Sequence, residues 1–190
     1  MYERTLTSTR AYTGRVLALD LLEIETDQGV RAKRDIVRHR GAVAVLCRRP
    51  DGMLVLVRQF RKPVEKILLE VVAGKLEADE NPEVCARREV LEETGHTVTA
   101  LRSLGFIHPT PGYSDETLHL FEAQVDATPQ AHQADADEDL ATVTLTPAEF
   151  EARIASGEIV DAKTLCIWLL ACLKGRKAEV GDQKCPSNTH

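Results

Sequence analysis

The segment from Gly74 to Gly95 constrains this chain more than any other. It reads GKLEADENPEVCARREVLEETG, and its pattern predicts a helix from about Pro82 to Thr94. Asn81 is suited to cap the helix N-terminus, proline favours the first helical position, and a glycine can end a helix in the left-handed conformation. We therefore expect a loop over residues 74–80 that leads directly into this helix.

The predicted helix carries several carboxylates on one face. At about 100° per residue, Glu89, Glu92 and Glu93 fall within a sector roughly 100° wide. Like charges at this spacing destabilise a helix by roughly 0.2–0.5 kcal/mol per pair, and hard oxygen ligands suit Mg²⁺ or Mn²⁺ better than zinc. Alone, the three glutamates would more often be a solvated face than a metal site. The side chains expected to point toward the core are Val84, Val90 and Leu91.

The joint pattern of residues around this helix favours a metal site over a solvated face. It consists of Gly74, Glu80, Arg88, Glu89, Glu92, Glu93 and Gly95. At these positions the chain resembles the Nudix box, the metal- and diphosphate-binding segment of the Nudix hydrolases. His96 departs from the family, which usually has an aliphatic residue there, and this bears on local packing. The resemblance implies a Mg²⁺ site, with Mn²⁺ as the alternative ion, whose ligands are Glu89, Glu92, Glu93 and the backbone carbonyl of Ala73.

Four further segments are similar to the ADP-ribose pyrophosphatase group of Nudix hydrolases. They are RQFR at 58–61, LEVVAG at 69–74, TPGYSDE at 110–116 and SGEIVDAKTL at 156–165. The resemblance implies Mg²⁺-dependent hydrolysis of ADP-ribose to AMP and ribose 5-phosphate by a homodimer. Two alternatives stay open: a pyrophosphatase for another nucleotide sugar such as GDP-mannose, and a catalytically weak protein that binds ADP-ribose as a sensor.

The same segments supply candidate substrate contacts. Arg58 and Arg61 suit the diphosphate or the terminal ribose, since a guanidinium matches paired oxygens, although both could be solvated strand-end arginines. Glu70 would accept a hydrogen bond from a ribose hydroxyl, or be only an edge-strand charge. In the Pro-Gly segment, Gly112 and Glu116 are expected at the substrate, with Glu116 positioning the terminal ribose or starting a strand.

Hydrolysis also needs a general base. The resemblance places it in an acidic loop, here Asp135–Asp139, where the family usually has two glutamates separated by one residue. This chain has Ala136 and Glu138 at those positions. We therefore predict Glu138 as the base, with Glu116 as a second candidate, and Ala136 is the one feature that favours a sensor. The predicted catalytic residues are Glu138, Glu93 and Arg88, the last of which orients the carboxylates through Glu80.

The order of predicted elements indicates an α/β protein. Residues 1–40 are expected to form an N-terminal antiparallel hairpin of two strands, 15–26 and 30–37, around a turn at 27–29. Predicted strands follow at 41–47, 53–61, 68–72, 98–107, 117–125 and 142–145, with helices at 82–94, 146–155 and 161–173. By resemblance, residues 41–175 form a Nudix α/β/α sandwich with a mixed sheet, and the hairpin crosses to a partner subunit. Residues 176–190 are predicted to be a disordered tail.

Charge and cysteine content indicate which partners and which cellular compartment to expect. The formal net charge is −6 and the pI about 5.6, which argues against a general nucleic-acid binder. The five cysteines contain no Cys-x-x-Cys pair, so we expect neither a zinc site nor disulfides, and a reducing cytoplasmic location. No stretch approaches the 18 apolar residues of a membrane span. The predicted ligand is a nucleoside diphosphate sugar.

Overall fold

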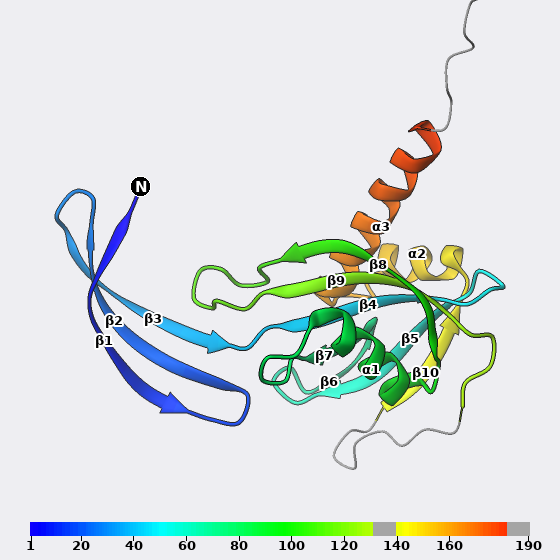
Figure 1. The fold of residues 1–190 in the computed structure, drawn as a ribbon, viewed down its shortest axis with the longest axis horizontal. Helices are drawn as coiled ribbons and strands as arrows, with labels where there is room; N and C mark the ends of the chain where they lie inside the picture. The colour runs from blue at the N-terminus through cyan, green and yellow to red at the C-terminus, as the bar shows by residue number, and fades with distance from the viewer. Residues whose placement is uncertain (131–139, 182–190) are drawn as a thin grey trace, which may run out of the picture.

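The computed structural model describes residues 1–130 and 140–181, with side chains up to residue 175. Two sheets and three helices make up these residues (Figure 1). The strands are β1 (Glu3–Thr13), β2 (Leu17–Thr26), β3 (Arg31–His39), β4 (Ala42–Arg48), β5 (Leu54–Arg61), β6 (Lys66–Glu70), β7 (Val72–Lys75), β8 (Val98–Ile107), β9 (Leu118–Val125) and β10 (Leu140–Leu145). The helices are α1 (Pro82–Thr94), α2 (Pro147–Ala155) and α3 (Ala162–Gly181).

The main sheet is mixed, as predicted. Its strand order is β10-β5-β4-β9-β8, with β6 also paired to β5 and β7 also paired to β4. The pairing of β4 with β9 is parallel, whereas the other pairings in this sheet are antiparallel. The α/β fold class expected from the sequence is therefore confirmed.

Strand β4 lies at the centre of a three-layer sandwich. Its side chains alternate between the two faces of the sheet, and Ala42 to Cys47 are all buried. Val43 and Val45 pack with residues of α1 in one apolar cluster, while Ala44 and Leu46 pack with residues of α2 and α3 in the other. The continuous apolar run in the sequence is thus explained by helices on both faces.

The N-terminal region differs from the predicted hairpin because it has three strands. β1, β2 and β3 form a separate antiparallel sheet, which Figure 1 shows in blue projecting away from the rest of the molecule. In β1 nearly every side chain is exposed, so the strand has no alternation of buried and exposed residues that the sequence could reveal. Large apolar side chains are exposed in this region, at Tyr2, Tyr12, Val16, Leu17, Leu21 and Val30.

The predicted strand at 68–72 is in fact two strands. Glu70 at the end of β6 pairs with β5, whereas Val72 at the start of β7 pairs with β4. Between them, the Val71 amide donates a hydrogen bond of 3.0 Å to Thr164 Oγ1 of α3. This side-chain acceptor satisfies the buried Val71 amide, which belongs to neither ladder, and so allows the chain to change partner strands.

Helix boundaries follow their caps. The Asn81 side chain accepts a 2.8 Å hydrogen bond from the Glu83 amide, and Gly95 ends α1 with φ 71°, which confirms the predicted bounds. α2 begins with a capping box between Thr146 and Glu149. α3 was predicted to end near Leu173 and instead continues to Gly181, past the predicted start of the tail; residues 182–190 lie outside the described part of the chain.

Two apolar residues of α1 do not reach the core as expected. Val84 and Leu91 are 58% and 43% exposed, and of the three predicted core residues only Val90 is buried. The buried stripe of α1 contains Cys85, Ala86 and Val90 and continues to Glu93. The side of α1 that faces the core therefore differs from the predicted one. It lies closer to the carboxylates, because Val90 and Glu93 are three residues apart and share a face of the helix.

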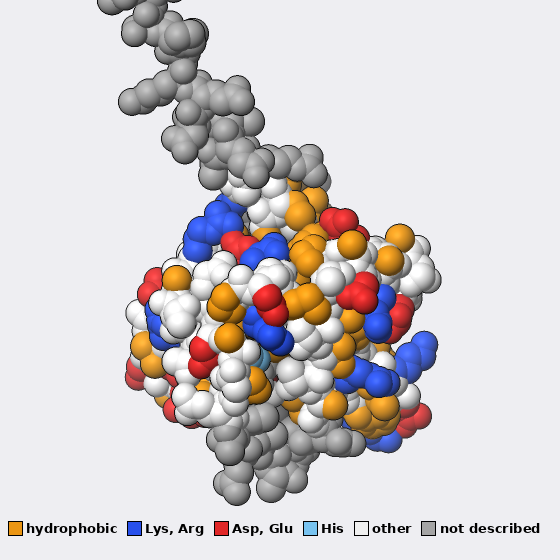
Figure 2. All heavy atoms as spheres, turned by 90° about the vertical axis from the view of Figure 1, so that its right-hand side faces the viewer, with side chains coloured by type: hydrophobic (Ala, Val, Ile, Leu, Met, Phe, Trp, Pro, Cys, Tyr) orange, Lys and Arg blue, Asp and Glu red, His pale blue; other side chains and the backbone are white. Residues whose placement is uncertain are grey.

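The surface carries charges of both signs. On the face seen in Figure 2, Lys and Arg side chains lie among Asp and Glu side chains and are not gathered into one basic field. None of the described helices is both long and apolar enough to cross a membrane.

The packing predicts the cost of removing a central aromatic side chain. Phe150 is fully buried and its ring lies 5.0 Å from that of Trp168. We expect Phe150→Ala to lower the free energy of unfolding by about 3–5 kcal/mol, measured by urea denaturation. The control is Phe60→Ala, because Phe60 is 47% exposed. A similar loss in both variants would contradict the assignment of Phe150 to the core.

Candidate active site

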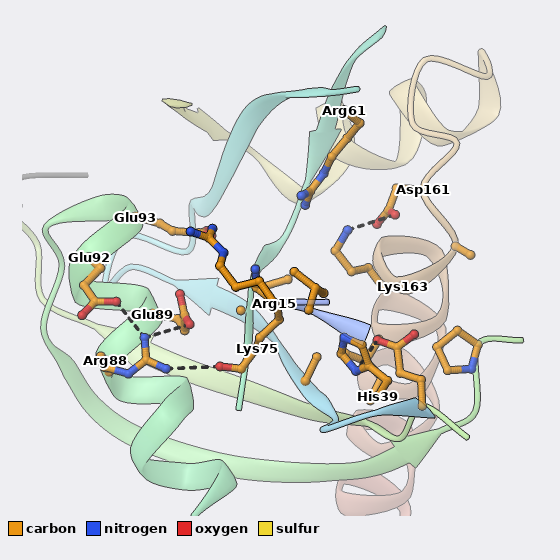
Figure 3. A pocket seen from close by; sticks show the side chains of 18 residues that line it. Arg15, His39, Arg61, Lys75, Arg88, Glu89, Glu92, Glu93, Asp161 and Lys163 are labelled. Carbon is orange, nitrogen blue, oxygen red and sulfur yellow. Dashed lines mark hydrogen bonds and ion pairs between the residues drawn. The ribbon is translucent and has the colours of Figure 1, made fainter. Parts of the chain in front are cut away.

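A cavity of about 520 Å³ lies where α1, the sheet and the start of α3 meet. Figure 3 shows its labelled side chains. The structure brings together most of the residues singled out from the sequence, since the cavity is lined by Arg61, Ala73, Arg88, Glu89, Glu92, Glu93 and Glu116. The predicted anionic face of the helix therefore opens onto a single cavity.

Arg88 joins the carboxylates of α1 to the loop that precedes the helix. Its guanidinium donates to both oxygens of Glu80 at 3.0 Å, and to Glu89 and Glu92 at 2.8 Å each. A further hydrogen bond of 3.3 Å reaches the Lys75 carbonyl. The hydrogen bonds from Arg88 lower the pKa of Glu80 to about 2, so Glu80 stays ionised and holds the arginine at neutral pH. The predicted role of Arg88 in orienting carboxylates agrees with this geometry.

Gly74 is required by the close approach of Glu89. A Cβ atom built on Gly74 would lie 1.8 Å from the Glu89 carboxyl carbon, well inside van der Waals contact. The Glu89 side chain therefore rests directly on the backbone of β7 at Gly74, one residue after Ala73, whose carbonyl the Nudix resemblance implies as a ligand. The loop predicted at residues 74–80 therefore begins later, since Gly74 and Lys75 belong to β7, and the glycine is needed there by the contact with Glu89.

The donor set suits a hard divalent cation. Three carboxylates line one cavity together with Ala73, and Glu93 is only 4% exposed. Within residues 1–130 and 140–181, no three Asp, Glu, His or Cys side chains converge as a ready metal cage. Glu89 and Glu92 are turned toward Arg88, and Figure 3 shows the Arg15 guanidinium pointing toward Glu93. The oxygen ligands fit Mg²⁺ or Mn²⁺, provided that they rotate toward the ion.

Glu70 is a buried ion-pair partner and not the edge-strand charge that was one alternative. Its side chain is 1% exposed and accepts two hydrogen bonds from Arg61, at 2.9 and 2.6 Å, and one from Lys163. Burial alone would raise the pKa of Glu70, but the bonds from Arg61 and the charge of Lys163 outweigh it, so the pKa lies below its usual value. Glu70 thus positions two cations that line the cavity.

The two arginines of β5 have different positions. Arg58 is exposed, outside the described cavity lining, whereas Arg61 lines the cavity. The two residues are three apart on a strand, so their side chains project from opposite faces of the sheet. The structure therefore places Arg61, and not Arg58, at the cavity; a substrate contact by Arg58 stays a prediction.

The Pro-Gly segment is held against the end of β3. The Val37 amide donates to the Tyr113 carbonyl at 2.7 Å, and the Asp115 amide returns a bond of 3.1 Å to the Val37 carbonyl. These bonds bring Glu116 to the cavity, where its Oε1 lies 3.7 Å from His39 Nδ1. Gly112 is exposed in this segment and outside the cavity lining. Glu138 and the acidic loop Asp135–Asp139 lie outside the described residues.

Several cavity residues were missed by reasoning from the sequence. They are Arg15, His39, Lys75, Asp161 and Lys163. Asp161 and Lys163 fall within the SGEIVDAKTL segment, so a signal was present, but they were assigned only to a helix start. Arg15 belongs to no recognised motif. It lies between β1 and β2, and β1 was not predicted from the sequence.

Comparison with known proteins assigns the family. Residues 37–165 match the model of the NUDIX domain, so the chain belongs to the NUDIX family, and the resemblance stated from its motifs is confirmed. The chain is 37% identical over 163 residues to an ADP-ribose pyrophosphatase of Bacillus subtilis (strain 168), covering 85% of this chain and 88% of that protein.

Two further relatives extend the comparison. A GDP-mannose pyrophosphatase of Cronobacter sakazakii (strain ATCC BAA-894) is 35% identical over 155 residues, covering 77% of this chain and 81% of that protein. A solved structure described as an ADP compounds hydrolase superposes with a TM-score of 0.79 at 22% identity, covering 97% of this chain and 98% of that chain. At this identity the superposition supports the fold alone.

The Gly74–Glu89 contact makes a specific prediction. Gly74→Ala should displace the Glu89 carboxylate and weaken divalent-metal binding at least about 10-fold, because the new Cβ occupies its place. Titration with Mn²⁺ followed by electron paramagnetic resonance measures this affinity. Gly175→Ala is the matched control, since a Cβ there meets nothing within 4 Å. Equal metal affinity in both variants would contradict the role given to Gly74.

Proposed function

We propose that this protein hydrolyses the diphosphate of ADP-ribose to AMP and ribose 5-phosphate, using a divalent metal ion. The observation that carries the proposal is that Glu89, Glu92 and Glu93 all line one cavity, whose other wall holds Arg61 and Lys163. The similarity to the B. subtilis ADP-ribose pyrophosphatase supports the same substrate. Nudix hydrolases generally use divalent metal ions, and Mg²⁺ is the ion we propose, with Mn²⁺ as the alternative.

The chemistry follows from the charge of the substrate. A diphosphate repels nucleophiles, and a divalent ion held by Glu89, Glu92, Glu93 and the Ala73 carbonyl would neutralise its oxygens and lower the pKa of water. Arg61 is placed to bind a phosphate oxygen, since Glu70 fixes its guanidinium at the cavity. Water then attacks one phosphorus, the bond to the bridging oxygen breaks, and a carboxylate accepts the proton of the water.

Glu138 remains our candidate for that carboxylate, with Glu116 as the second candidate. Glu116 lines the cavity, whereas Glu138 is outside the described residues. We expect Glu138→Gln to lower kcat at least about 100-fold with a smaller change in KM, because removing a base leaves substrate contacts in place. Steady-state kinetics with ADP-ribose measures both constants, and Glu116→Gln is assayed in parallel. Unchanged kcat in Glu138→Gln would exclude it as the base.

The substrate preference is tested by product release. Purified protein is incubated with Mg²⁺ and either ADP-ribose or GDP-mannose, and nucleoside monophosphate is quantified. GDP-mannose is the second candidate because the C. sakazakii relative is a GDP-mannose pyrophosphatase. Faster release of GMP than of AMP would move the proposal to that substrate. Binding of ADP-ribose without AMP release would instead favour a sensor.

We further propose that the protein is a homodimer built through its N-terminal sheet. A three-stranded sheet with this many exposed apolar side chains lacks a core of its own, and a partner subunit would cover it. Sedimentation equilibrium on the full chain tests this, and a monomer at micromolar concentration would contradict it. Free cysteines at the four described positions and a net charge of −6 fit a cytoplasmic protein with small-molecule substrates and no nucleic-acid partner.

Metal binding by Glu93 gives a further prediction. Glu93→Gln should weaken Mn²⁺ binding and reduce kcat/KM by more than about 100-fold, because it removes a charged ligand that is almost fully buried. The matched control is Glu83→Gln on the same helix, where the side chain is exposed and faces no cavity residue among those described. Retention of metal affinity in Glu93→Gln would rule out a direct ligand role.

A further inference from the structure

We propose that Arg38 is a positioning residue, which holds Glu116 at the cavity by tying the Pro-Gly segment to the N-terminal sheet. This inference deepens the proposed function and rests on it. The Pro-Gly segment lies between β8 and β9, and Figure 1 shows that loop on the side of the N-terminal sheet. Arg38 precedes His39 in β3; His39 lines the cavity, whereas Arg38 lies outside the described lining. Arg38 would therefore act on the site through a neighbouring residue and not by touching a ligand.

The Arg38 guanidinium joins two carboxylates from different parts of the molecule. Its Nε donates to Asp20 Oδ2 at 2.9 Å, and its Nη1 donates to Asp115 Oδ2 at 3.0 Å. Asp20 belongs to β2, is only 6% exposed, and also accepts hydrogen bonds from Arg10 of β1. A carboxylate this buried is unfavourable without its cationic partners, so Arg38 is anchored on the N-terminal sheet. It thereby presents a fixed donor to the Pro-Gly segment.

Asp115 is held at both of its carboxylate oxygens. Oδ2 accepts the hydrogen bond from Arg38, and Oδ1 accepts one of 2.8 Å from the His39 amide. The stretches 38–39 and 115–116 therefore lie side by side. The Arg38–Asp115 ion pair is outside the described cavity lining, and His39 and Glu116 are within it. Because Glu116 directly follows Asp115, the outer ion pair fixes the backbone from which the Glu116 side chain enters the cavity.

The alternative role for Arg38 is to stabilise the N-terminal sheet alone. Arg34 gives the comparison, because it lies on the same strand and pairs with Glu3 of β1 within that sheet. The two arginine side chains are similarly accessible, at 38% for Arg34 and 40% for Arg38. Arg34→Met is therefore the matched control for Arg38→Met. Both variants remove an ion pair of the N-terminal sheet, but Arg38→Met also removes the bond to Asp115.

The first test is amide hydrogen exchange, followed by NMR on the full chain without ligand. The Val37 and Asp115 amides bond across the contact between β3 and the Pro-Gly segment. We expect Arg38→Met to raise their exchange rates about fivefold, the effect of one partly exposed ion pair, and Arg34→Met to raise them less than about twofold. The Gly95 amide, which ends α1, should exchange equally in both variants. Equal exchange at Val37 and Asp115 in the two variants would overturn the proposal.

The second test asks whether Arg38 acts through Glu116. The ratio kcat/KM for ADP-ribose with Mg²⁺ is measured for Arg38→Met in the wild type and in Glu116→Gln. We expect a fall of about fivefold in the wild type and of less than about twofold in Glu116→Gln, because a positioning residue has no effect once its target is removed. A residue that only stabilises the sheet would lower kcat/KM by the same factor in both backgrounds. That result would overturn the proposal.

A further variant keeps the proposal testable if Arg38→Met does not fold. Asp115→Asn retains an oxygen acceptor for the His39 amide but removes the charge that faces Arg38. It should fold with a near-normal melting temperature and show the same changes as Arg38→Met in both tests. Wild-type exchange rates in Asp115→Asn, or an equal fall of kcat/KM in the two backgrounds, would also overturn the proposal.

The positioning role and the proposed function can fail separately. A wild type that releases no AMP with Mg²⁺ refutes the hydrolase, and hydrogen exchange in the ligand-free protein then decides alone whether Arg38 holds the Pro-Gly segment. A wild type that releases AMP, together with equal exchange in Arg38→Met and Arg34→Met, would keep the hydrolase and refute the positioning role.

Discussion

The Arg88 guanidinium is the interaction on which the geometry of the site depends. It connects the loop before α1, through Glu80 and the Lys75 carbonyl, with two carboxylates on the helix. Without it, three acidic side chains would repel one another at the edge of the core, and the loop would have no ionic tie to the helix. One cation thus allows a helix to present several anions on one side while its other side packs against the sheet.

The opposite wall uses the same principle with the signs reversed. There, one buried carboxylate, Glu70, holds two cations at the cavity surface. Burying such a charge is unfavourable unless it is paired, so each cation is held in one position as a condition of folding. The two walls therefore each hold charged side chains at fixed positions, one through Arg88 and the other through Glu70.

The sequence predicted the elements whose signals are local. The bounds of α1 and α2 followed from Asn81, Gly95 and Thr146, because caps act within one helical turn. It also predicted that the three glutamates share a face, which depends only on helix geometry. It did not predict β1, whose side chains are nearly all exposed, nor the break at Val71, which depends on a hydroxyl 93 residues away.

Prediction of the site failed where tertiary contacts decide the outcome. Arg58 and Arg61 looked equivalent until the strand placed them on opposite faces. Val84 and Leu91 looked like core residues, but small side chains in α1 bring the helix close to the sheet along a different stripe. Lys163 was assigned only to a helix start, although it lies in one of the quoted segments, because its partner Glu70 lies on another element. Pairs of residues that are far apart in the chain produce no spacing pattern that can be recognised in a single sequence.

The change of partner strands at Val71 also ties the two walls of the cavity to one short stretch of backbone. Glu70, just before it, holds Arg61 and Lys163 at one wall of the cavity, and Ala73, just after it, lines the cavity with the carboxylates of α1, while Thr164 ties the junction to α3. The buried backbone between Glu70 and Ala73 therefore determines how far apart the two walls lie. A shift of α3 by one helical step would alter that separation by about 1.5 Å, so the distance between the two walls depends on how α3 packs in the core.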